Sequence, residues 1–275
     1  MFLLKIFNTD ITKVPFRRLG VININIMLLG IMGAMPEEMD RIIAAINHKE
    51  IVESGSRIYY RGDLYGQDVV AVFSRWGKVA AATTATNMIL HFKVDRIIFT
   101  GVAGAISHEL NVGDIVIGQR LYQHDMDARP LMRRFEIPLT GKTSYETPQQ
   151  NVDTMAQAVH NFLKNNKEFR KILSDHNIPN PKMLSGDIAS GDLFISSTEM
   201  KHALIKNLPS VLCAEMEGAA VAQVCDDFGV PLTVVRVISD TADEEAHISA
   251  IGFVNQHAGD YSLSILKEYI NLIQH

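Results

Sequence analysis

Cysteine is scarce in this sequence, and long hydrophobic runs are missing. Its 275 residues include only two cysteines, Cys213 and Cys225, without the CxxC spacing or neighbouring histidines of a metal site. No apolar run reaches the roughly 18 residues that a membrane-spanning helix needs. We therefore expect buried, reduced thiols in a cytoplasmic protein that has no membrane partner.

Basic clusters and nucleotide-binding loops are also absent. The formal net charge is −5, and the Lys and Arg residues are scattered along the chain. This distribution argues against nucleic acid or an anionic membrane as a partner. The small residues 101–105 are followed by no Gly-Lys-Ser/Thr and do not form GxGxxG, so neither a P-loop nor a dinucleotide fingerprint is present. We expect no cofactor.

The first 26 residues differ from the rest of the chain. Their apolar start is soon interrupted by Asn8, Thr9 and Asp10, and no small-residue cleavage pattern follows, which excludes a signal peptide. Met27 directly precedes the first convincing strand. We hypothesise that residues 1–26 are a dispensable, disordered extension or reflect an upstream translation start, and that residues 27–275 form the functional domain.

Short apolar runs alternate with helical patterns along residues 27–275. The run 27–32 reads as a strand buried on both faces, and Pro36 then begins a helix with an apolar stripe at Met39, Ile42, Ile43 and Ile46. Further strands are predicted within 57–75, which is a hairpin turning at 65–68, and at 96–100, 114–123, 183–190, 211–214 and 231–238. Further helices are predicted at 79–91, 153–165, 168–175, 218–228 and 248–273. This alternation predicts one α/β domain, a three-layer α/β/α sandwich with a central mixed sheet.

Four acidic residues lie where predicted strands end: Glu38, Glu215, Glu217 and Asp240. Glu38, Glu215 and Glu217 could simply cap a helix or favour its dipole. Because ligands of α/β proteins bind at the carboxyl ends of strands, these residues could equally face a site. Phe194 also follows a strand, and an exposed aromatic there suits stacking on a flat base, although it could instead fold back on the core.

Residues 124–150 form the longest irregular stretch, which in a compact domain is usually functional or disordered. His124, Asp125 and Asp127 raise the possibility of a metal site. No fourth ligand lies at a suitable spacing, so we expect no metal.

Together these residues match what a nucleoside requires. An aromatic side chain suits the base, a carboxylate suits the ribose diol, and two further acids could supply chemistry. Cleavage of an N-glycosidic bond needs a proton on the departing base and a nucleophile at the anomeric carbon, and carboxyl groups with different pKa values can provide both.

Four motifs resemble the bacterial 5′-methylthioadenosine/S-adenosylhomocysteine nucleosidases. They are Gly33-Ala34-Met35 with Glu37-Glu38, Ser190-Gly191-Asp192 with Phe194-Ile195, Ala214-Glu215-Met216-Glu217-Gly218-Ala219, and Val235-Arg236-Val237-Ile238-Ser239-Asp240. The resemblance covers about residues 27–273 and implies a nucleoside phosphorylase-like fold. It also implies a homodimer in which the 124–150 loop completes the partner's site.

The resemblance assigns roles to individual residues. Asp240 resembles the acid that protonates N7 of adenine, and Glu38 resembles the base that activates water. Glu217 would hold the ribose hydroxyls and Arg236 would orient Glu217. The remaining substrate contacts implied are Phe194 and the Ile195 backbone at adenine, Met216 at the sugar, and Met35, Ala103 and Gly104 close to the ligand.

Several departures leave the 5′-substituent open. Val102, Leu131 and Ala250 replace residues usual in the family, and Trp76 replaces a smaller aliphatic residue. Trp76 could be a packing lid or a ligand contact. We expect cleavage of methylthioadenosine, S-adenosylhomocysteine and 5′-deoxyadenosine, with 6-amino-6-deoxyfutalosine as the alternative substrate.

Two rival functions remain. A purine nucleoside phosphorylase would need a cationic phosphate site, to which Arg75 and Lys78 could contribute, but the carboxylate of Glu38 would repel phosphate. A non-catalytic nucleoside-binding module would need Phe194 and Glu217 but neither Glu38 nor Asp240. A hydrolase accounts for all four residues.

Overall fold

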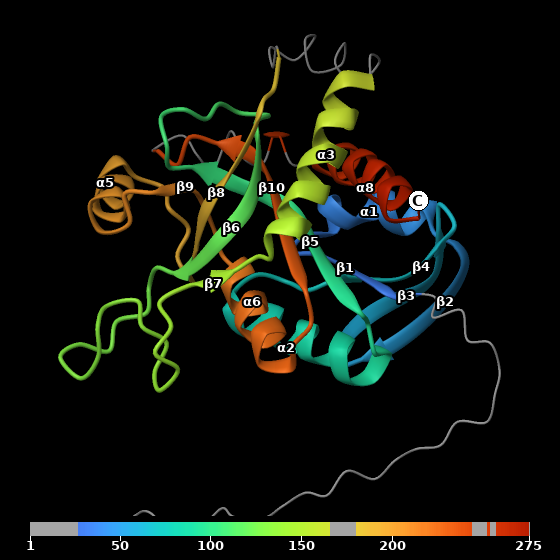
Figure 1. Ribbon diagram of the computed structural model, residues 1–275, viewed down its shortest axis with the longest axis horizontal. Helices are drawn as coiled ribbons and strands as arrows, with labels where there is room; N and C mark the ends of the chain where they lie inside the picture. Colours follow the sequence, from blue (N-terminus) through green and yellow to red (C-terminus); the bar gives the residue numbers. More distant parts are fainter. Residues whose placement is uncertain (1–26, 166–179, 244–251, 254–256, 275) are drawn as a thin grey trace, which may run out of the picture.

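The computed structural model describes residues 27–165, 180–243, 252–253 and 257–274 (Figure 1). The predictions for residues 1–26, for the helix at 168–175, for Ala250 and for the beginning of the final helix therefore lie partly or wholly outside the described residues.

The strands are β1 (Leu29–Gly33), β2 (Asn47–Ser54), β3 (Arg57–Leu64), β4 (Gln67–Phe73), β5 (Arg96–Ala105), β6 (Ile115–Gln123), β7 (Tyr145–Glu146), β8 (Met183–Ser190), β9 (Val211–Glu215) and β10 (Leu232–Asp240). The helices are α1 (Pro36–Ala45), α2 (Lys78–Asn87) with the π-helical turn η1 (Met88–Phe92), α3 (Gln149–Asn165), α5 (Thr198–Asn207), α6 (Gly218–Phe228) and α8 (Gly259–Ile273).

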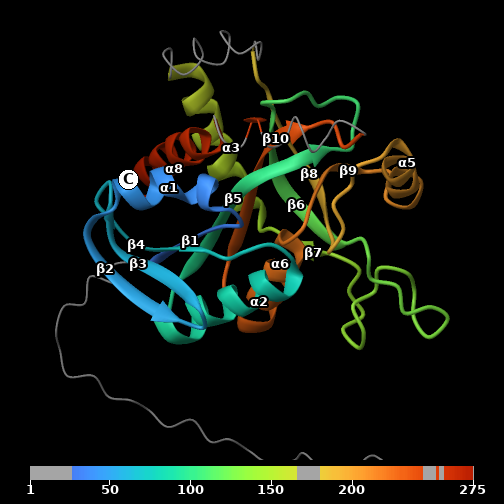
Figure 2. The ribbon, with the colours of Figure 1, turned by 180° about the vertical axis from the view of Figure 1, so that it is seen from behind.

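These strands form one mixed sheet, and the predicted class of fold is confirmed. Strand β1 lies between β4 and β5 and runs parallel to both, and β10 runs parallel to β5. The strands β2, β3 and β4 form an antiparallel meander at one end of the sheet. Figure 2 shows this meander from behind, beside β1.

Part of the sheet closes on itself. Strand β5 pairs with β10, β10 with β6, β6 with β8, β8 with β9, and β9 again with β5. The last pairing is antiparallel and joins only Gly104 with Ala214 and Ala105 with Cys213. It therefore brings together the carboxyl ends of two strands that run in opposite directions.

Helices cover both faces of the sheet. One core lies under α1, α3 and α8, and a second lies under α2 and α6 (Figure 1). The apolar stripe predicted on α1 is confirmed, since Met39, Ile42 and Ile46 are buried. Helix α6 ends where the sequence indicates, because Gly229 adopts the left-handed conformation with φ of 66°.

Some elements were not predicted. Strand β2 carries mostly exposed residues, so it lacks the alternation that marks a half-buried strand. Helix α5 was also missed, although Ser197 caps it by accepting a hydrogen bond from the Met200 N–H. Both cysteines are buried and unpaired. Within the described ranges no helix is long and apolar enough to cross a membrane.

Candidate active site

Glu38 joins the turn after β1 to the end of β5. It is the third residue of α1, and its side chain is almost fully buried. Its Oε2 accepts hydrogen bonds from the N–H groups of Ala34, at 2.7 Å, and Met35, at 3.0 Å. Its Oε1 accepts a third from the Val102 N–H, at 2.9 Å. Three backbone donors thus hold the carboxylate in one orientation.

A glycine on β5 makes room for this carboxylate. A Cβ placed on Gly101 would lie 2.6 Å from Glu38 Oε1 and 3.0 Å from Arg236 Nη1. Burial raises the pKa of Glu38, although Arg236 and the three N–H donors oppose the shift. A carboxylate with a raised pKa is a stronger base, and the N–H donors stabilise its ionised form.

Glu215 is the partner of Arg236. The Arg236 Nη2 lies 2.6 Å from Glu215 Oε2, and both side chains are buried. The Glu215 carboxylate also accepts the Gly218 N–H on both oxygens, at 2.9 and 2.8 Å, at the beginning of α6. Glu215 is therefore a helix-capping residue, as one of the two readings of the sequence held. Arg236, which was predicted to orient Glu217, donates its hydrogen bond to Glu215 and acts on Glu217 through its charge.

Glu217 lies in the same buried group of charges. Its Oε1 accepts a hydrogen bond of 2.8 Å from the N–H of Gly77, which precedes α2. Burial, followed by the nearby Glu215, raises the pKa of Glu217 to about 8. At neutral pH the Glu217 carboxyl can therefore carry a proton and offer both a donor and an acceptor, which suits a pair of hydroxyl groups.

Asp240 ends β10 beside Gly104 of β5. Its Oδ2 accepts from the Ser239 hydroxyl at 2.8 Å, and its Oδ1 accepts from the Ala242 N–H at 2.9 Å. A Cβ on Gly104 would lie 2.7 Å from Asp240 Oδ1, so the glycine leaves the space that the Asp240 carboxyl group occupies. Burial raises the pKa of Asp240, although its two hydrogen bonds oppose the shift.

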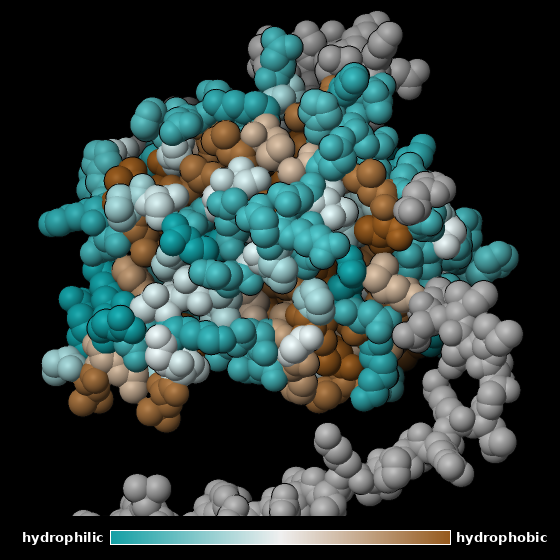
Figure 3. All heavy atoms as spheres, viewed as in Figure 1, coloured by the Kyte–Doolittle hydropathy of each residue, from teal (hydrophilic) through white to brown (hydrophobic). Residues whose placement is uncertain are grey.

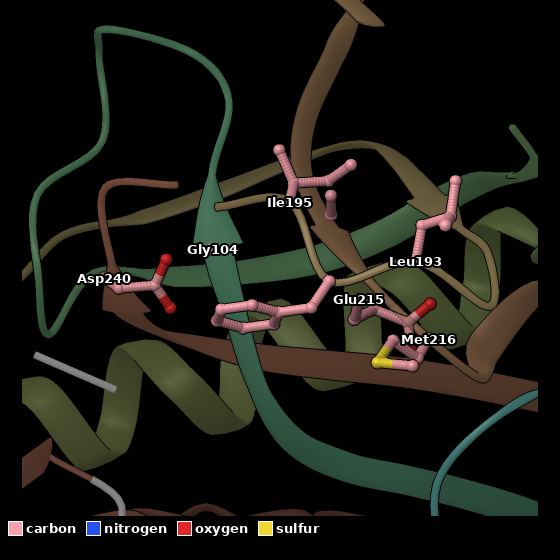
Figure 4. A pocket seen from close by; sticks show the side chains of 8 residues that line it. Gly104, Leu193, Ile195, Glu215, Met216 and Asp240 are labelled. Carbon is pink, nitrogen blue, oxygen red and sulfur yellow. The ribbon is translucent and has the colours of Figure 1, made fainter. Parts of the chain in front are cut away.

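A pocket lies where the ends of β5, β9 and β10 meet the loop after β8. Figure 4 shows Asp240 beside Gly104, with Glu215 and Met216 on the opposite side and Leu193 and Ile195 above. Phe194 and Ala214 complete its lining. The pocket thus unites five of the predicted site residues: Gly104, Phe194, Ile195, Met216 and Asp240. Phe194 is 46% exposed, which is unusual for an aromatic residue that packs only in a core.

The other predicted residues lie outside this lining. Glu38, Glu217 and Arg236 form the buried charged group beside it, in which three acids including Glu215 surround one cation. Met35 contributes its N–H to Glu38, and the side chain of Ala103 is packed in the core. Trp76 is 63% exposed and so does not act as a packing lid over the core.

Two of the three residues considered for a metal site, Asp125 and Asp127, have other partners. Asp125 binds Lys78, and Asp127 binds Arg129. Among the described residues no group of three or more His, Cys, Asp or Glu side chains could hold a metal ion.

Sequence reasoning assigned no role to three supporting residues, although two of them, Ser190 and Ser239, lie in the motifs that resemble the family. The Ser190 hydroxyl donates to Glu215 and accepts from the Ala219 N–H, and Ser239 and Gly77 bond to Asp240 and Glu217. Each is a small residue at the end of a strand or the beginning of a helix, next to one of the acids in the fold. Only Ser239 is also next to its acid in the sequence, so it alone could have been found.

Comparison with known proteins identifies the family of this fold and site. The family model of the phosphorylase superfamily matches residues 28–271. A methylthioadenosine/S-adenosylhomocysteine nucleosidase from Shewanella baltica is 33% identical over 250 residues, which cover 89% of this chain and 98% of the relative. The chain belongs to this nucleosidase family. It is a hydrolase that cleaves the N-glycosidic bond of an adenosine-type nucleoside.

An aminodeoxyfutalosine nucleosidase from Helicobacter pylori is as similar to this chain as the Shewanella baltica relative is. It is 34% identical over 248 residues, which cover 88% of this chain and 97% of the relative. Among solved structures, a methylthioadenosine/S-adenosylhomocysteine nucleosidase from Neisseria meningitidis, in complex with methylthio-immucillin-A, matches with a TM-score of 0.79 at 29% identity. That match covers 88% of this chain and 98% of the other. A futalosine hydrolase from Helicobacter pylori matches with a TM-score of 0.73 at 32% identity, over 90% and 98% of the two chains.

Proposed function

We propose that this enzyme releases adenine from 5′-substituted adenosines, with methylthioadenosine, S-adenosylhomocysteine and 5′-deoxyadenosine as its substrates. The observation that carries the proposal is the placement of two buried carboxyl groups with raised pKa, Asp240 in the pocket and Glu38 in the adjoining charged group. Hydrolysis of a glycosidic bond needs one group that gives a proton and one that accepts a proton from water.

Asp240 is the proposed acid. Because burial favours its neutral form, it can retain a proton until the base departs and donate it to N7 of adenine. Glu38 is the proposed base, which removes a proton from the attacking water. Its raised pKa increases its basicity, and its three N–H donors stabilise it as a carboxylate before the reaction.

The transition state is oxocarbenium-like, so positive charge develops on the ribose. Glu38 and Glu215 together carry more negative charge than Arg236 neutralises, and buried carboxylates stabilise such a cation more strongly than water does. Glu217 is also the proposed ligand of the ribose hydroxyls.

The remaining groups are proposed to bind the nucleoside. Phe194 stacks on adenine and the Ile195 backbone bonds to its edge, while Met216 packs on the sugar. Gly104 and Ala103 allow the ligand to approach β5, and Met35 lies at the turn that holds Glu38. Arg236 is proposed to act through its hydrogen bond to Glu215 and through its charge on Glu217.

Aminodeoxyfutalosine is a second candidate substrate. Its support is that the Helicobacter pylori aminodeoxyfutalosine nucleosidase is as similar to this chain as the methylthioadenosine/S-adenosylhomocysteine nucleosidases are. Trp76 also supports this second substrate, because a large exposed aromatic residue next to Gly77 could contact a bulky 5′ group.

A phosphorylase reaction is disfavoured by the charges. Lys78 is bound to Asp125 at 2.6 Å, and Arg75 donates to the Ser56 carbonyl at 2.6 Å. The charge of Lys78 is therefore already neutralised by a carboxylate, and the buried carboxylate of Glu38 would repel phosphate.

The proposed assembly is a homodimer in which the 124–150 loop contacts the partner's site. Leu131 and Leu139 on this loop are 87% and 93% exposed, and Figure 3 shows hydrophobic side chains projecting where this loop lies. Light scattering of a Leu131→Asp, Leu139→Asp variant should give the mass of a monomer, and an unchanged dimer would contradict the proposed interface.

A substrate panel tests the proposed function. Methylthioadenosine, S-adenosylhomocysteine, 5′-deoxyadenosine and aminodeoxyfutalosine should be scored by adenine release, each with and without phosphate. We expect a phosphate-independent rate on the first three. If aminodeoxyfutalosine alone were cleaved, the second candidate would be correct, and a phosphate-dependent rate that yields ribose 1-phosphate would overturn hydrolysis.

A further inference from the structure

Three segments that are distant in the sequence meet at one carboxylate beside the active site. Asp125 follows β6, and its Oδ1 lies 2.6 Å from the Nζ of Lys78, the first residue of α2. Its Oδ2 accepts a hydrogen bond of 2.9 Å from the N–H of Asp192, in the loop after β8. We call Lys78, Asp125 and Asp192 the α2 clasp.

A further bond closes the clasp. The N–H of Lys78 donates to Asp192 Oδ1 at 2.8 Å, so Lys78 and Asp192 are joined both directly and through Asp125. The Lys78 and Asp125 side chains are only 17% and 18% exposed. An ion pair on the open surface contributes little, but hydrogen bonds between charged groups that are shielded from water are considerably stronger.

Both ends of the clasp lead directly into the active site. Gly77, which immediately precedes Lys78, donates its N–H to Glu217. Leu193, Phe194 and Ile195, which immediately follow Asp192, line the pocket. The clasp therefore fixes the distance between the donor that holds Glu217 and the wall of the pocket.

The turn before α2 is built for this contact. Gly77 has φ of 89°, a conformation that favours glycine. A Cβ at Gly77 would lie 2.9 Å from Asp192 Oδ1. Two successive N–H groups at the beginning of α2 are thus assigned to two carboxylates, Glu217 and Asp192, and a side chain between them would push them apart.

We propose that Asp125 is a positioning residue, which acts through Lys78 and Asp192 to hold Glu217 and the Leu193–Ile195 wall in the arrangement that binds the nucleoside. The proposal rests on the proposed function in one respect, namely that Glu217 and Phe194 bind the substrate. Asp125 touches neither the acid Asp240 nor the base Glu38 in any described contact. Its loss should therefore weaken substrate binding far more than the chemical step.

The first experiment compares Asp125→Asn with Asp260→Asn. Asn keeps one acceptor oxygen where the clasp uses two, and it removes the charge that binds Lys78. For Asp125→Asn with methylthioadenosine we expect KM to rise about tenfold and kcat to stay within about threefold, as for a lost charged hydrogen bond that serves binding. Asp260 on α8 forms an ion pair with Arg41 on α1, and both side chains are exposed. The Asp260→Asn variant should therefore have the KM and kcat of the wild type.

A second readout does not depend on activity. Trp76 is the only tryptophan in the chain and is adjacent to Gly77. Its fluorescence anisotropy should fall in Asp125→Asn, because the turn is released, and stay unchanged in Asp260→Asn. If the wild type released no adenine from any nucleoside, the proposed function would fail, whereas the anisotropy would still test the clasp.

A double-variant comparison separates the clasp from a general loss of structure. Lys78→Met should raise KM to a similar extent, and Lys78→Met combined with Asp125→Asn should be no worse than either alone, with Tm within a few degrees of wild type. Additive effects, an unchanged KM in Asp125→Asn, or a fall in kcat as large as the rise in KM would each overturn the proposal.

Discussion

Asp240 has the surroundings of a group that must hold and then release a proton. Burial favours its neutral form and raises its pKa, whereas the Ser239 hydroxyl and the Ala242 N–H favour the ionised form. Burial is the larger effect, so the pKa is raised, while the two hydrogen bonds remain in place to stabilise the carboxylate once the proton has left. A carboxyl group in this balance can donate a proton and remain stable afterwards as a carboxylate.

The Asp240→Asn variant should lose about 10²–10⁴-fold in kcat, because one positioned proton donor contributes that much. Substrate affinity should change little, since the amide keeps the size of the carboxyl group. Adenine release measures kcat, and calorimetric titration with a non-hydrolysable nucleoside measures binding. Asp153→Asn, an exposed carboxylate on α3, serves as the control. Turnover close to wild type in Asp240→Asn would exclude the acid role.

At the scale of elements, β5 contributes space rather than side chains. Gly101 leaves room for Glu38 and Arg236, and Gly104 leaves room for Asp240. One strand thus sets the position of the proposed base, the proposed acid and the buried arginine. The antiparallel contact between β5 and β9 then adds Glu215, the last residue of a strand of opposite direction, and Met216, which follows it.

A Gly101→Ala substitution should displace Glu38, because the new Cβ would lie 2.6 Å from Oε1 and 2.9 Å from the carboxyl carbon. We expect kcat for adenine release to fall at least 100-fold, as for loss of a positioned base. Gly118→Ala on β6 is the matched control, since its Cβ would approach the end of the Ile188 side chain at 3.1 Å and otherwise make ordinary contacts with Val234 at 3.5 and 3.6 Å. Equal activities for the two variants would show that Glu38 is not placed by β5.

At the scale of the whole molecule, local patterns predicted the elements and the β3–β4 hairpin well, but they did not predict the pairings between distant strands. Alternation of apolar runs and helical stripes was sufficient for α1, α6 and the strands that surround them, because each pattern is complete within a few residues. The β5–β9 contact and the Arg236–Glu215 ion pair depend on which distant segments meet, and no local pattern records that. Strand β2 was missed because tertiary pairing with β3, rather than its own alternation, makes it a strand.

The group of acids also affects the stability of the whole molecule. The pKa of Glu217 is raised from 4.5 to about 8 by burial and by Glu215, so between these values the folded protein binds a proton that the unfolded chain has released. The free energy of unfolding contributed by this group is therefore largest below pH 4.5 and is lost as the pH rises toward 8. Glu38 and Asp240 shift in the same direction.

Urea unfolding at pH 5, 6, 7 and 8 and fixed protein concentration should thus give a decreasing free energy of unfolding for the wild type. Glu217→Gln should flatten this decrease by up to about 1.4 kcal/mol per pH unit, the value for one proton. Gln keeps an oxygen that accepts the Gly77 N–H, so the variant should fold. Glu53→Gln, at an exposed position on β2, should retain the wild-type slope. If Glu217→Gln and the wild type had the same slope, Glu217 would not be protonated in the folded enzyme, and its proposed donation of a hydrogen bond to the ribose would be excluded as well.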